Sequence, residues 1–147
     1  MFKHILIPTD GSETAGKAVH AGIALAAEIG ARVTGYCAQE PVPTHIYGEG
    51  YVADKRLVTE FERRASDFAK RNVKAIEEAA KAAGVAFTPL VTRSPMPYRG
   101  IIAAAEKNGC DAIVMASNGH RGLQKLLLGS VTQEVLTHSK IPVLVYR

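Results

Sequence analysis

The sequence has no tryptophan, and its aromatic side chains supply only 6% of its 147 residues. So little aromatic surface leaves little for stacking on exposed bases. The formal net charge of +4 is mild, and the lysines and arginines are scattered along the chain instead of forming a basic run. Both features argue against a dedicated nucleic-acid-binding protein, which would concentrate its positive charge on one face.

Cysteines and long apolar runs are scarce as well. Cys37 and Cys110 are the only cysteines, and they form neither a CxxC pair nor a zinc-finger spacing. Their apolar or small neighbours are typical of buried free thiols in a reducing cytoplasm. No run approaches the ~20 apolar residues of a membrane helix, and MFKHILIPTD at the start lacks the apolar stretch of a signal peptide. We therefore expect a soluble cytoplasmic protein that makes no membrane contact.

The motifs of several enzyme classes are missing too. There is no GxxxxGK(S/T) P-loop, no GxGxxG after the first apolar run and no GxSxG. No carboxylate cluster is suited to holding metal ions for phosphoryl transfer, and no two histidines have metal-binding spacing on one helix. We therefore assign no catalytic residue and no metal ligand, although Asp10 and His120 lie roughly where an activating base would be needed.

What the sequence does contain is a regular alternation of apolar runs and helical patterns. With 147 residues, 47% of them hydrophobic, the chain can bury one proper core, and we expect residues 1–147 to form a single domain. Short apolar runs predict strands at Phe2–Pro8, Arg32–Ala38, Val85–Val91, Asp111–Ala116 and Pro142–Tyr146.

Helical patterns fill the intervals between these runs. The first has apolar residues at helical spacing and a glycine as a natural stop, namely Ala15, Val19, Ile23, Ala26 and Gly30. Shorter helices are predicted at Tyr98–Asn108 and Ser130–His138.

A long helix is predicted from Asp54 to Ala83, with Gly84 as its end. Its buried stripe is expected to comprise Leu57, Phe61, Ala65, Phe68, Ile76 and Ala80. Because strands that alternate with helices imply crossover units, we predict an open, doubly wound α/β sheet of parallel strands covered on both faces.

Ligands of such sheets bind beyond the carboxyl ends of the strands, where the strand order reverses. If the first and fourth strands are central neighbours, the turns PTDGS (8–12) and ASNGHRGL (116–123) meet there. Asp10 in the first turn either caps the following helix or presents its carboxylate to the polar groups of a ligand. Ser12 alone could supply the cap.

The segment around Gly129 has two compatible interpretations. Ser130 and Gln133 form a capping-box pattern. A capped helix start after a glycine also presents free N–H groups and the positive end of the helix dipole, which bind phosphate. Gly129 and Gly119 would let the backbone approach the phosphates closely. The long segment Gln39–Val52, rich in proline and glycine, is either a mobile surface loop or a flap over a site.

Four segments in order, ILIPTDGS, IVMASNG, LLLGSVTQEVL and KIPVLVYR, resemble the universal stress protein family over the whole chain. The resemblance implies a five-stranded parallel sheet in the order 3-2-1-4-5 and a homodimer that pairs the last strands, here Pro142 to Tyr146. The ATP-binding branch of the family carries a G-x2-G-x9-G-S/T motif. Its positions hold Ala116, Gly119, Gly129 and Ser130 here, so alanine replaces the first glycine. At a strand end, where φ is expected to be negative, alanine costs little.

Carried over by position, the resemblance implies an ATP site with a base and ribose side, a wall and a phosphate end. Asn118 stands where many members have histidine. The base and ribose side would be lined by Pro8, Thr9, Asp10 and the backbone of Ala116. The wall would be Cys37, with Met115 nearby. The phosphates would be held by the main-chain N–H groups of Gly119, Gly129, Ser130 and Val131, and by the hydroxyl of Ser130.

The function that the resemblance implies is a small cytoplasmic stress-response module whose occupancy by ATP regulates its conformation or its choice of partner. A divalent cation such as Mg²⁺ would bridge the phosphates. Two other functions stay open. One is a slow ATPase or phosphoryl-transfer enzyme that uses Asp10 or His120 as its base. The other is a dimeric interaction protein that binds no nucleotide.

Overall fold

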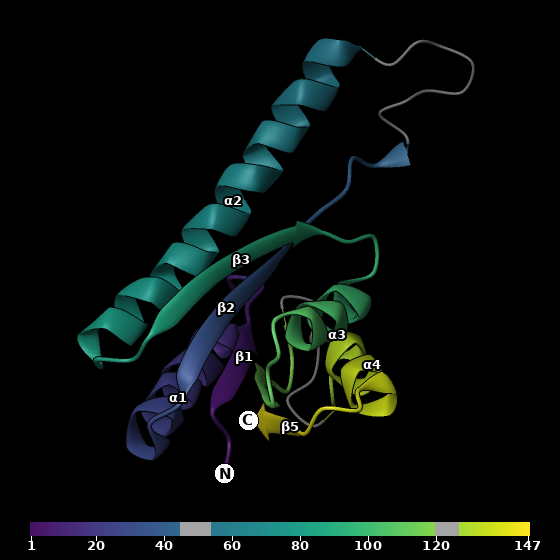
Figure 1. The fold of residues 1–147 in the computed structure, drawn as a ribbon. Coiled ribbons are helices and arrows are strands. Elements are labelled where there is room, and N and C mark those ends of the chain that lie inside the picture. The colour runs from purple at the N-terminus through teal and green to yellow at the C-terminus, as the bar shows by residue number, and fades with distance from the viewer. Residues whose placement is uncertain (45–53, 120–126) are drawn as a thin grey trace.

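The computed structural model describes residues 1–44, 54–119 and 127–147. In these residues, strands and helices alternate along the chain (Figure 1). Their bounds are β1 His4–Pro8, α1 Glu13–Ile29, β2 Arg32–Gln39, α2 Lys55–Ala82, β3 Phe87–Arg93, α3 Pro97–Lys107, β4 Ala112–Ala116, α4 Ser130–His138 and β5 Val143–Tyr146.

The strands form one parallel sheet in the order β3-β2-β1-β4-β5. Ile5 of the central strand β1 lies opposite Val33 of β2 on one side and Ala112 of β4 on the other. The predicted order 3-2-1-4-5 is therefore confirmed, and so is the expectation that the first and fourth strands are neighbours. The strand order reverses between β1 and β4, which puts the ligand-binding crevice of this kind of sheet at their carboxyl ends.

Helices cover both faces of the sheet, as predicted for a doubly wound fold (Figure 1). Ile5 and Ile7 of β1 pack into one core cluster with residues of α1 and α2, including Ile76. Leu6, between them in sequence, packs into the opposite cluster with residues of α3 and α4, including Val135. Because side chains alternate across a strand and both faces are covered, every residue of β1 is buried.

Helix α1 follows its sequence pattern closely. Ala15, Val19, Ile23 and Ala26 are all buried, as their helical spacing predicts. Gly30 at the end of the helix has a φ of 70°, and its N–H donates to the Ala26 carbonyl oxygen. The glycine is needed there because left-handed backbone is unfavourable for other residues.

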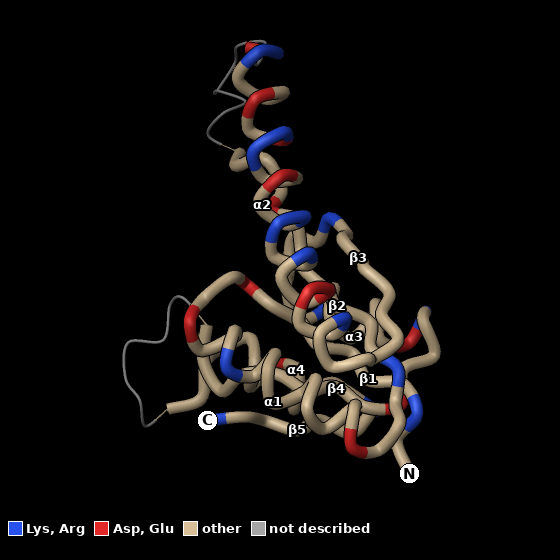
Figure 2. The backbone as a smooth tube through the Cα atoms, turned by 90° about the vertical axis from the view of Figure 1, so that its left-hand side faces the viewer, with Lys and Arg blue, Asp and Glu red and all other residues tan. Residues whose placement is uncertain are grey.

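Helix α2 departs from its predicted stripe. Leu57 is 60% exposed and Phe68 is 45% exposed, and the buried residues of α2 are Ala69, Val73, Ile76 and Ala80. The amino-terminal half of the helix extends past the end of the sheet, so only its second half has strands beneath it (Figure 1). Acidic and basic residues are mixed along the projecting part (Figure 2), where Glu60 pairs with Arg63 and Arg64.

The third strand begins two residues later than predicted, at Phe87. Val85 is instead tied to the end of α2, because its N–H donates to the Ala80 carbonyl oxygen (2.9 Å). At their carboxyl ends, β2 and β3 each run past the prediction, to Gln39 and Arg93. No helix in the described part of the chain is both long and apolar enough to cross a bilayer.

A buried polar pair lies at the other end of the sheet, where the strands begin. The Nε2 atom of His4 lies 2.8 Å from Thr34 Oγ1, and both side chains are buried. Nδ1 of His4 has no hydrogen-bond partner among the described residues. Burial, helped by the positive charge of Arg32, lowers the pKa of His4, so this imidazole is kept neutral.

Candidate functional site

The two turns that sequence analysis singled out do meet at the carboxyl ends of β1 and β4. Asp10 follows β1 by two residues, and its Oδ2 atom lies so close to Gly119 that a side chain on Gly119 would clash with it. Pro8 is the last residue of β1, and the N–H of Thr9 donates to the Tyr36 carbonyl oxygen of β2 (2.8 Å). The first turn is thus anchored on one side to β2 and touches the second turn on the other.

Hydrogen bonds within the first turn show which residue caps α1. Ser12 is the N-cap residue of α1, because its Oγ accepts from the Ala15 N–H (3.1 Å). The carboxylate of Asp10 accepts from the Ser12 N–H through Oδ1 (2.9 Å), and Thr9 Oγ1 accepts from the Gly11 N–H (3.1 Å). Asp10 therefore shapes the turn rather than capping the helix, and its second oxygen faces Gly119.

The start of α4 differs from the predicted capping box. The N-cap residue is Gly129, with a φ of −62°, and the structure shows no side-chain hydrogen bond at the cap. Ser130 is the first helical residue, so the prediction that it caps the helix through Gln133 is wrong. The reason is register: the Gln133 N–H donates to the Gly129 carbonyl oxygen (3.0 Å), which places the helix boundary one residue earlier than the pattern suggested.

Gly129 also plays a different part from the one the resemblance implied. Its N–H donates to the Ser117 carbonyl oxygen (2.8 Å), so it is already engaged and does not offer a donor to a phosphate. A Cβ atom on Gly129 would lie 3.3 Å from both the Asn118 Cα and the Ser117 carbonyl oxygen. Because its φ is negative, this glycine serves close approach of two chain segments and not an unusual backbone conformation.

Thr132 joins the same two segments and was missed by sequence reasoning. It is 3% exposed, and its Oγ1 donates to the Ala116 carbonyl oxygen at the end of β4 (2.8 Å). No signal in the sequence pairs a helix threonine with a strand carbonyl across 16 residues. With this bond and the Gly129–Ser117 bond, the first turn of α4 is fastened to the end of β4.

Ala116, which replaces the first glycine of the motif, sits in the structure without strain. It is the last residue of β4 and is buried. Among the described residues, no amino acid other than glycine has a positive φ, which confirms the expected negative φ at Ala116. The backbone of this position therefore does not require glycine.

Cys37 and Met115 lie on opposite faces of the sheet. Cys37 packs beneath α2 with Ala69 and Val73, whereas Met115 packs with Val135 of α4. The expectation that Met115 would lie near Cys37 is therefore wrong, because successive strand residues alternate between faces and these two strands differ in phase. Burial raises the pKa of the Cys37 thiol, so it is a neutral apolar surface. Val131 is also directed to the α3 and α4 side, where it packs against the core.

Asn72 of α2 is a second residue that sequence reasoning missed. Its amide nitrogen and oxygen each lie 2.8 Å from where a Cβ of Gly11 would be. Its Nδ2 also donates weakly to Cys37 Sγ (3.9 Å). Gly11 has a φ of 79°, so both backbone conformation and space require glycine here. Asn72 thus contacts, from the α2 side of the sheet, both the turn that follows β1 and the carboxyl-terminal part of β2.

The whole sequence, residues 1–147, matches the model of the universal stress protein family. The chain belongs to the universal stress protein family. A family member from Methanocaldococcus jannaschii is 33% identical, with 100% of this chain and 96% of that protein covered. Its solved structure superposes with a TM-score of 0.82 at 29% identity, over 99% of this chain and 95% of that chain.

Two further solved structures of family members are nucleotide complexes. One, in complex with cAMP, has a TM-score of 0.68 at 23% identity and covers 99% of this chain and 97% of that chain. The other, from Archaeoglobus fulgidus and in complex with dAMP, has a TM-score of 0.66 at 18% identity and covers 100% of this chain and 98% of that chain. At these identities the likeness of both to this universal stress protein is one of fold.

Parts of the predicted site fall outside the described residues of this family member. His120 and most of the turn that follows Gly119 are among them, and so is the larger part of the segment Gln39–Val52. In residues 1–44, 54–119 and 127–147, no group of three histidine, cysteine, aspartate or glutamate side chains is arranged to hold a metal ion. The described part of this edge presents a helix amino terminus, a carboxylate, a hydroxyl and amides.

Proposed function

We propose that this universal stress protein is a nucleotide-binding regulatory module that takes ATP together with a divalent cation, with Mg²⁺ as the natural candidate. The observation that supports this proposal most strongly is that two hydrogen bonds hold the start of α4 against the end of β4, beside Asp10. It holds the amino terminus of a nine-residue helix at the crevice where β1 and β4 part. The first N–H groups of a helix have no acceptor within it, and with the helix dipole they attract phosphate.

The proposed phosphate end consists of Ser130 and Val131, through their N–H groups and the serine hydroxyl. Gly119 and Gly129 contribute the space for close approach, and Asn118 packs against Gly129. Pro8, Thr9 and Asp10 would line the ribose side, and Cys37 would form the wall on the α2 side. Met115, which points to the other face, contributes only through its backbone. The adenine nucleotides held by two relatives support this choice of ligand.

The cation would be held by the phosphates, because the described residues offer no ready metal site. We assign no catalytic residue. We also propose that the chain works as one cytoplasmic domain and forms a homodimer through β5. That strand lies at the edge of the sheet, and it exposes Leu144 and Tyr146, which a second copy of the strand could cover.

Calorimetric titration of nucleotide-stripped protein with ATP and Mg²⁺, with AMP and GTP for comparison, tests the proposal. Ser130→Ala and Gly129→Val should both weaken ATP binding, and Gly129→Val more strongly because its side chain would press on residues 117 and 118. Gly16→Val is the matched control, since a Cβ atom added at Gly16 on α1 would meet no atom of another element within 4 Å. Wild-type protein that binds no nucleotide, or Gly129→Val protein that is folded and binds ATP normally, would refute the site.

A further inference from the structure

Helix α2 carries a second apolar face besides the one that packs on the sheet. The buried residues of α2 are Ala69, Val73, Ile76 and Ala80. Because successive residues of a helix are about 100° apart, these buried residues fall within an arc of about 60° that faces the sheet. Leu57, Phe61 and Phe68 fall within another arc of about 40°, whose centre lies about 110° from that of the first. We call these three residues the Leu57 stripe.

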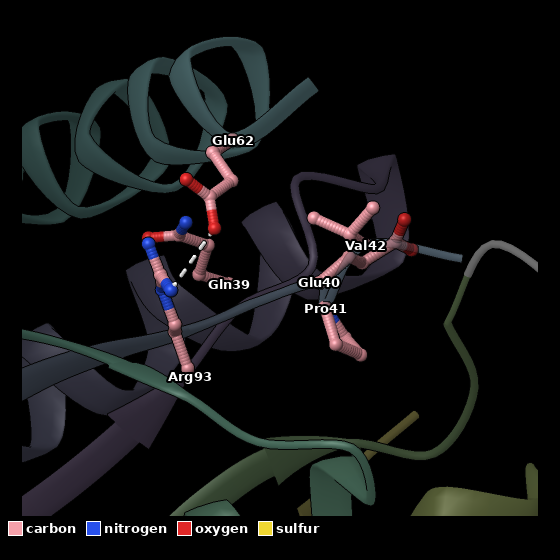
Figure 3. A pocket seen from close by; sticks show the side chains of 6 residues that line it. All are labelled: Gln39, Glu40, Pro41, Val42, Glu62 and Arg93. Carbon is pink, nitrogen blue, oxygen red and sulfur yellow. Dashed lines mark ion pairs between the residues drawn. The ribbon is translucent and has the colours of Figure 1, made fainter. Parts of the chain in front are cut away.

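A contact with the sheet fixes the direction of the Leu57 stripe. Glu62 falls in the sheet-facing arc of α2, and its Oε1 lies 3.2 Å from Nη1 of Arg93 at the end of β3. Figure 3 shows these two side chains pointing toward each other. The stripe therefore faces away from the sheet, and Leu57 and Phe68 are exposed. Phe68 directly precedes the buried Ala69, so its exposure follows from the direction in which it points.

The form of the Leu57 stripe suits a helix as its partner. Scattered apolar residues on a surface are ordinary, whereas apolar side chains gathered in one patch indicate an interaction surface. Spacings of four and seven residues place side chains along one ridge of a helix, which can pack into the groove of a second helix. The amino-terminal half of α2 stands clear of the sheet (Figure 1), with charged residues along it (Figure 2), so a second helix has room to lie beside it.

The charges beside the Leu57 stripe suit a second copy of α2 that runs antiparallel. In a two-fold pair, residue i faces residue j and j faces i. When Leu57 lies opposite Phe68 of the second copy, Phe61 lies opposite Arg64 of the second copy. The Arg64 guanidinium is held beside the stripe because its Nε donates to Glu60 Oε1 (2.7 Å). In this register it lies over an aromatic ring, which attracts a cation.

The ends of the pair favour the antiparallel arrangement over a parallel one. In the antiparallel register the exposed Asp54, the N-cap residue of α2, lies opposite the exposed Arg71 of the second copy. Arg71 forms no ion pair with any other described residue. In a parallel pair, Arg64 and Arg71 would each face their own counterparts, and like charges that meet across an interface are unfavourable. The antiparallel pair also keeps the two sheets apart, because only the amino-terminal half of α2 projects (Figure 1).

We propose that the Leu57 stripe is a homotypic interface, in which α2 of one copy pairs antiparallel with α2 of another. This inference goes beyond the proposed function, since it needs no nucleotide. Helix α2 packs on β2 and β3, whereas the proposed dimer contact of β5 uses the opposite edge of the sheet, so one chain can make both contacts. Residues 55–68 form a helix segment about 21 Å long. A pair of such segments is an interface below about 1,200 Å², which forms reversibly.

Sedimentation velocity at several protein concentrations tests the proposal in Leu144→Glu protein, which lacks the proposed β5 contact. This protein should still dimerise reversibly. Adding Leu57→Glu should raise the dissociation constant at least about tenfold, because each pair would bury two unpaired charges. Thr59→Glu is the matched control, since it adds the same charge at an exposed position about 180° round the helix from the stripe. Circular dichroism checks that each variant is folded.

Two outcomes of this experiment would overturn the proposal. One is folded Leu144→Glu protein that stays monomeric at every concentration. The other is a Leu57→Glu variant that associates as strongly as the Thr59→Glu variant.

Cross-linking tests the register in protein with an intact β5. Leu57→Cys and Phe68→Cys proteins are treated with a short bis-maleimide, each alone and as an equal mixture. The native Cys37 and Cys110 are buried, so the introduced thiols should react first. The antiparallel register predicts a covalent dimer mainly in the mixture, and little product when Thr59→Cys replaces Leu57→Cys. Cross-linking that is as strong within each variant alone as in the mixture would overturn the antiparallel pair.

Discussion

The bond between Thr132 and Ala116 gives a sharp prediction about what holds α4 in place. Thr132→Val keeps the size and branching of the side chain and replaces only the hydroxyl by a methyl group. The hydroxyl is buried and donates to the Ala116 carbonyl oxygen at 2.8 Å. The substitution therefore removes one buried hydrogen bond and leaves a strand-end carbonyl with one donor fewer.

The expected cost follows from that single contact. Losing a buried hydrogen bond, with its acceptor still in place, lowers the free energy of unfolding by about 1–2 kcal/mol. In a domain of this size each kcal/mol moves Tm by about 2–4 °C, so a fall of about 2–8 °C is expected. Because the chain has no tryptophan, urea unfolding is best followed by far-ultraviolet circular dichroism, with the thermal transition as a second readout.

The same helix supplies a control for this experiment. Thr137 Oγ1 donates to the Gln133 carbonyl oxygen, also at 2.8 Å, but on the exposed side of α4. Thr137→Val makes the same chemical change where water replaces the lost donor, so its effect should be close to zero. If Thr132→Val were no more destabilising than Thr137→Val, the view that a buried bond fastens α4 to β4 would be wrong.

Three further predictions concern the motif, a buried histidine and the sheet edge. Ala116→Gly should lower the free energy of unfolding by about 0.5–1 kcal/mol and leave ATP affinity unchanged in titration; a clear gain in affinity would mean that the alanine methyl group obstructs the ligand. The pKa of His4 is lowered below its ordinary 6.5. Below pH 6.5 the imidazole therefore takes up a proton in the unfolded chain while it stays neutral in the folded chain. Stability should therefore be full above pH 6.5 and fall as pH drops toward the folded pKa. Urea titrations at several pH values should show this loss reduced in His4→Gln but not in His20→Gln. Leu144→Glu should convert the proposed dimer to a monomer in size-exclusion chromatography with light scattering, and a monomeric wild type would contradict the dimer.

Sequence periodicity predicted α1 correctly and α2 only in part, for a physical reason. A helical stripe shows which face of a helix is apolar, but burial also needs an element beneath that face. All of α1 lies along the sheet, so Val19 and Ile23 are buried. Helix α2 is 28 residues long and runs past the sheet, so Leu57 keeps its apolar character and remains exposed. The length of the strands, which decides this, is not encoded in the helix.

The candidate site shows a similar limit. Topology alone brought Asp10 to Gly119, because the carboxyl ends of neighbouring parallel strands meet at one edge. Topology did not predict on which face of the sheet each side chain lies, because placing Cys37 relative to Met115 requires the register of three strands. Residues from distant elements were also beyond reach: Asn72 lies within an ordinary helix pattern, and its position above Gly11 depends on how α2 crosses the sheet.

The contacts of Gly129 show that this motif glycine has a structural role that does not depend on nucleotide binding. The glycine lets the start of α4 pack closely against residues 117 and 118, and its N–H donates to the Ser117 carbonyl oxygen. A family member that used this edge only for protein contacts would still need that packing, so the glycine spacing by itself does not separate binding from non-binding members. The Ser130 hydroxyl has no such structural duty, because Ser130 does not cap the helix. Binding measured on Ser130→Ala therefore reports on the ligand, whereas loss of binding in Gly129→Val also needs proof that α4 has stayed in place.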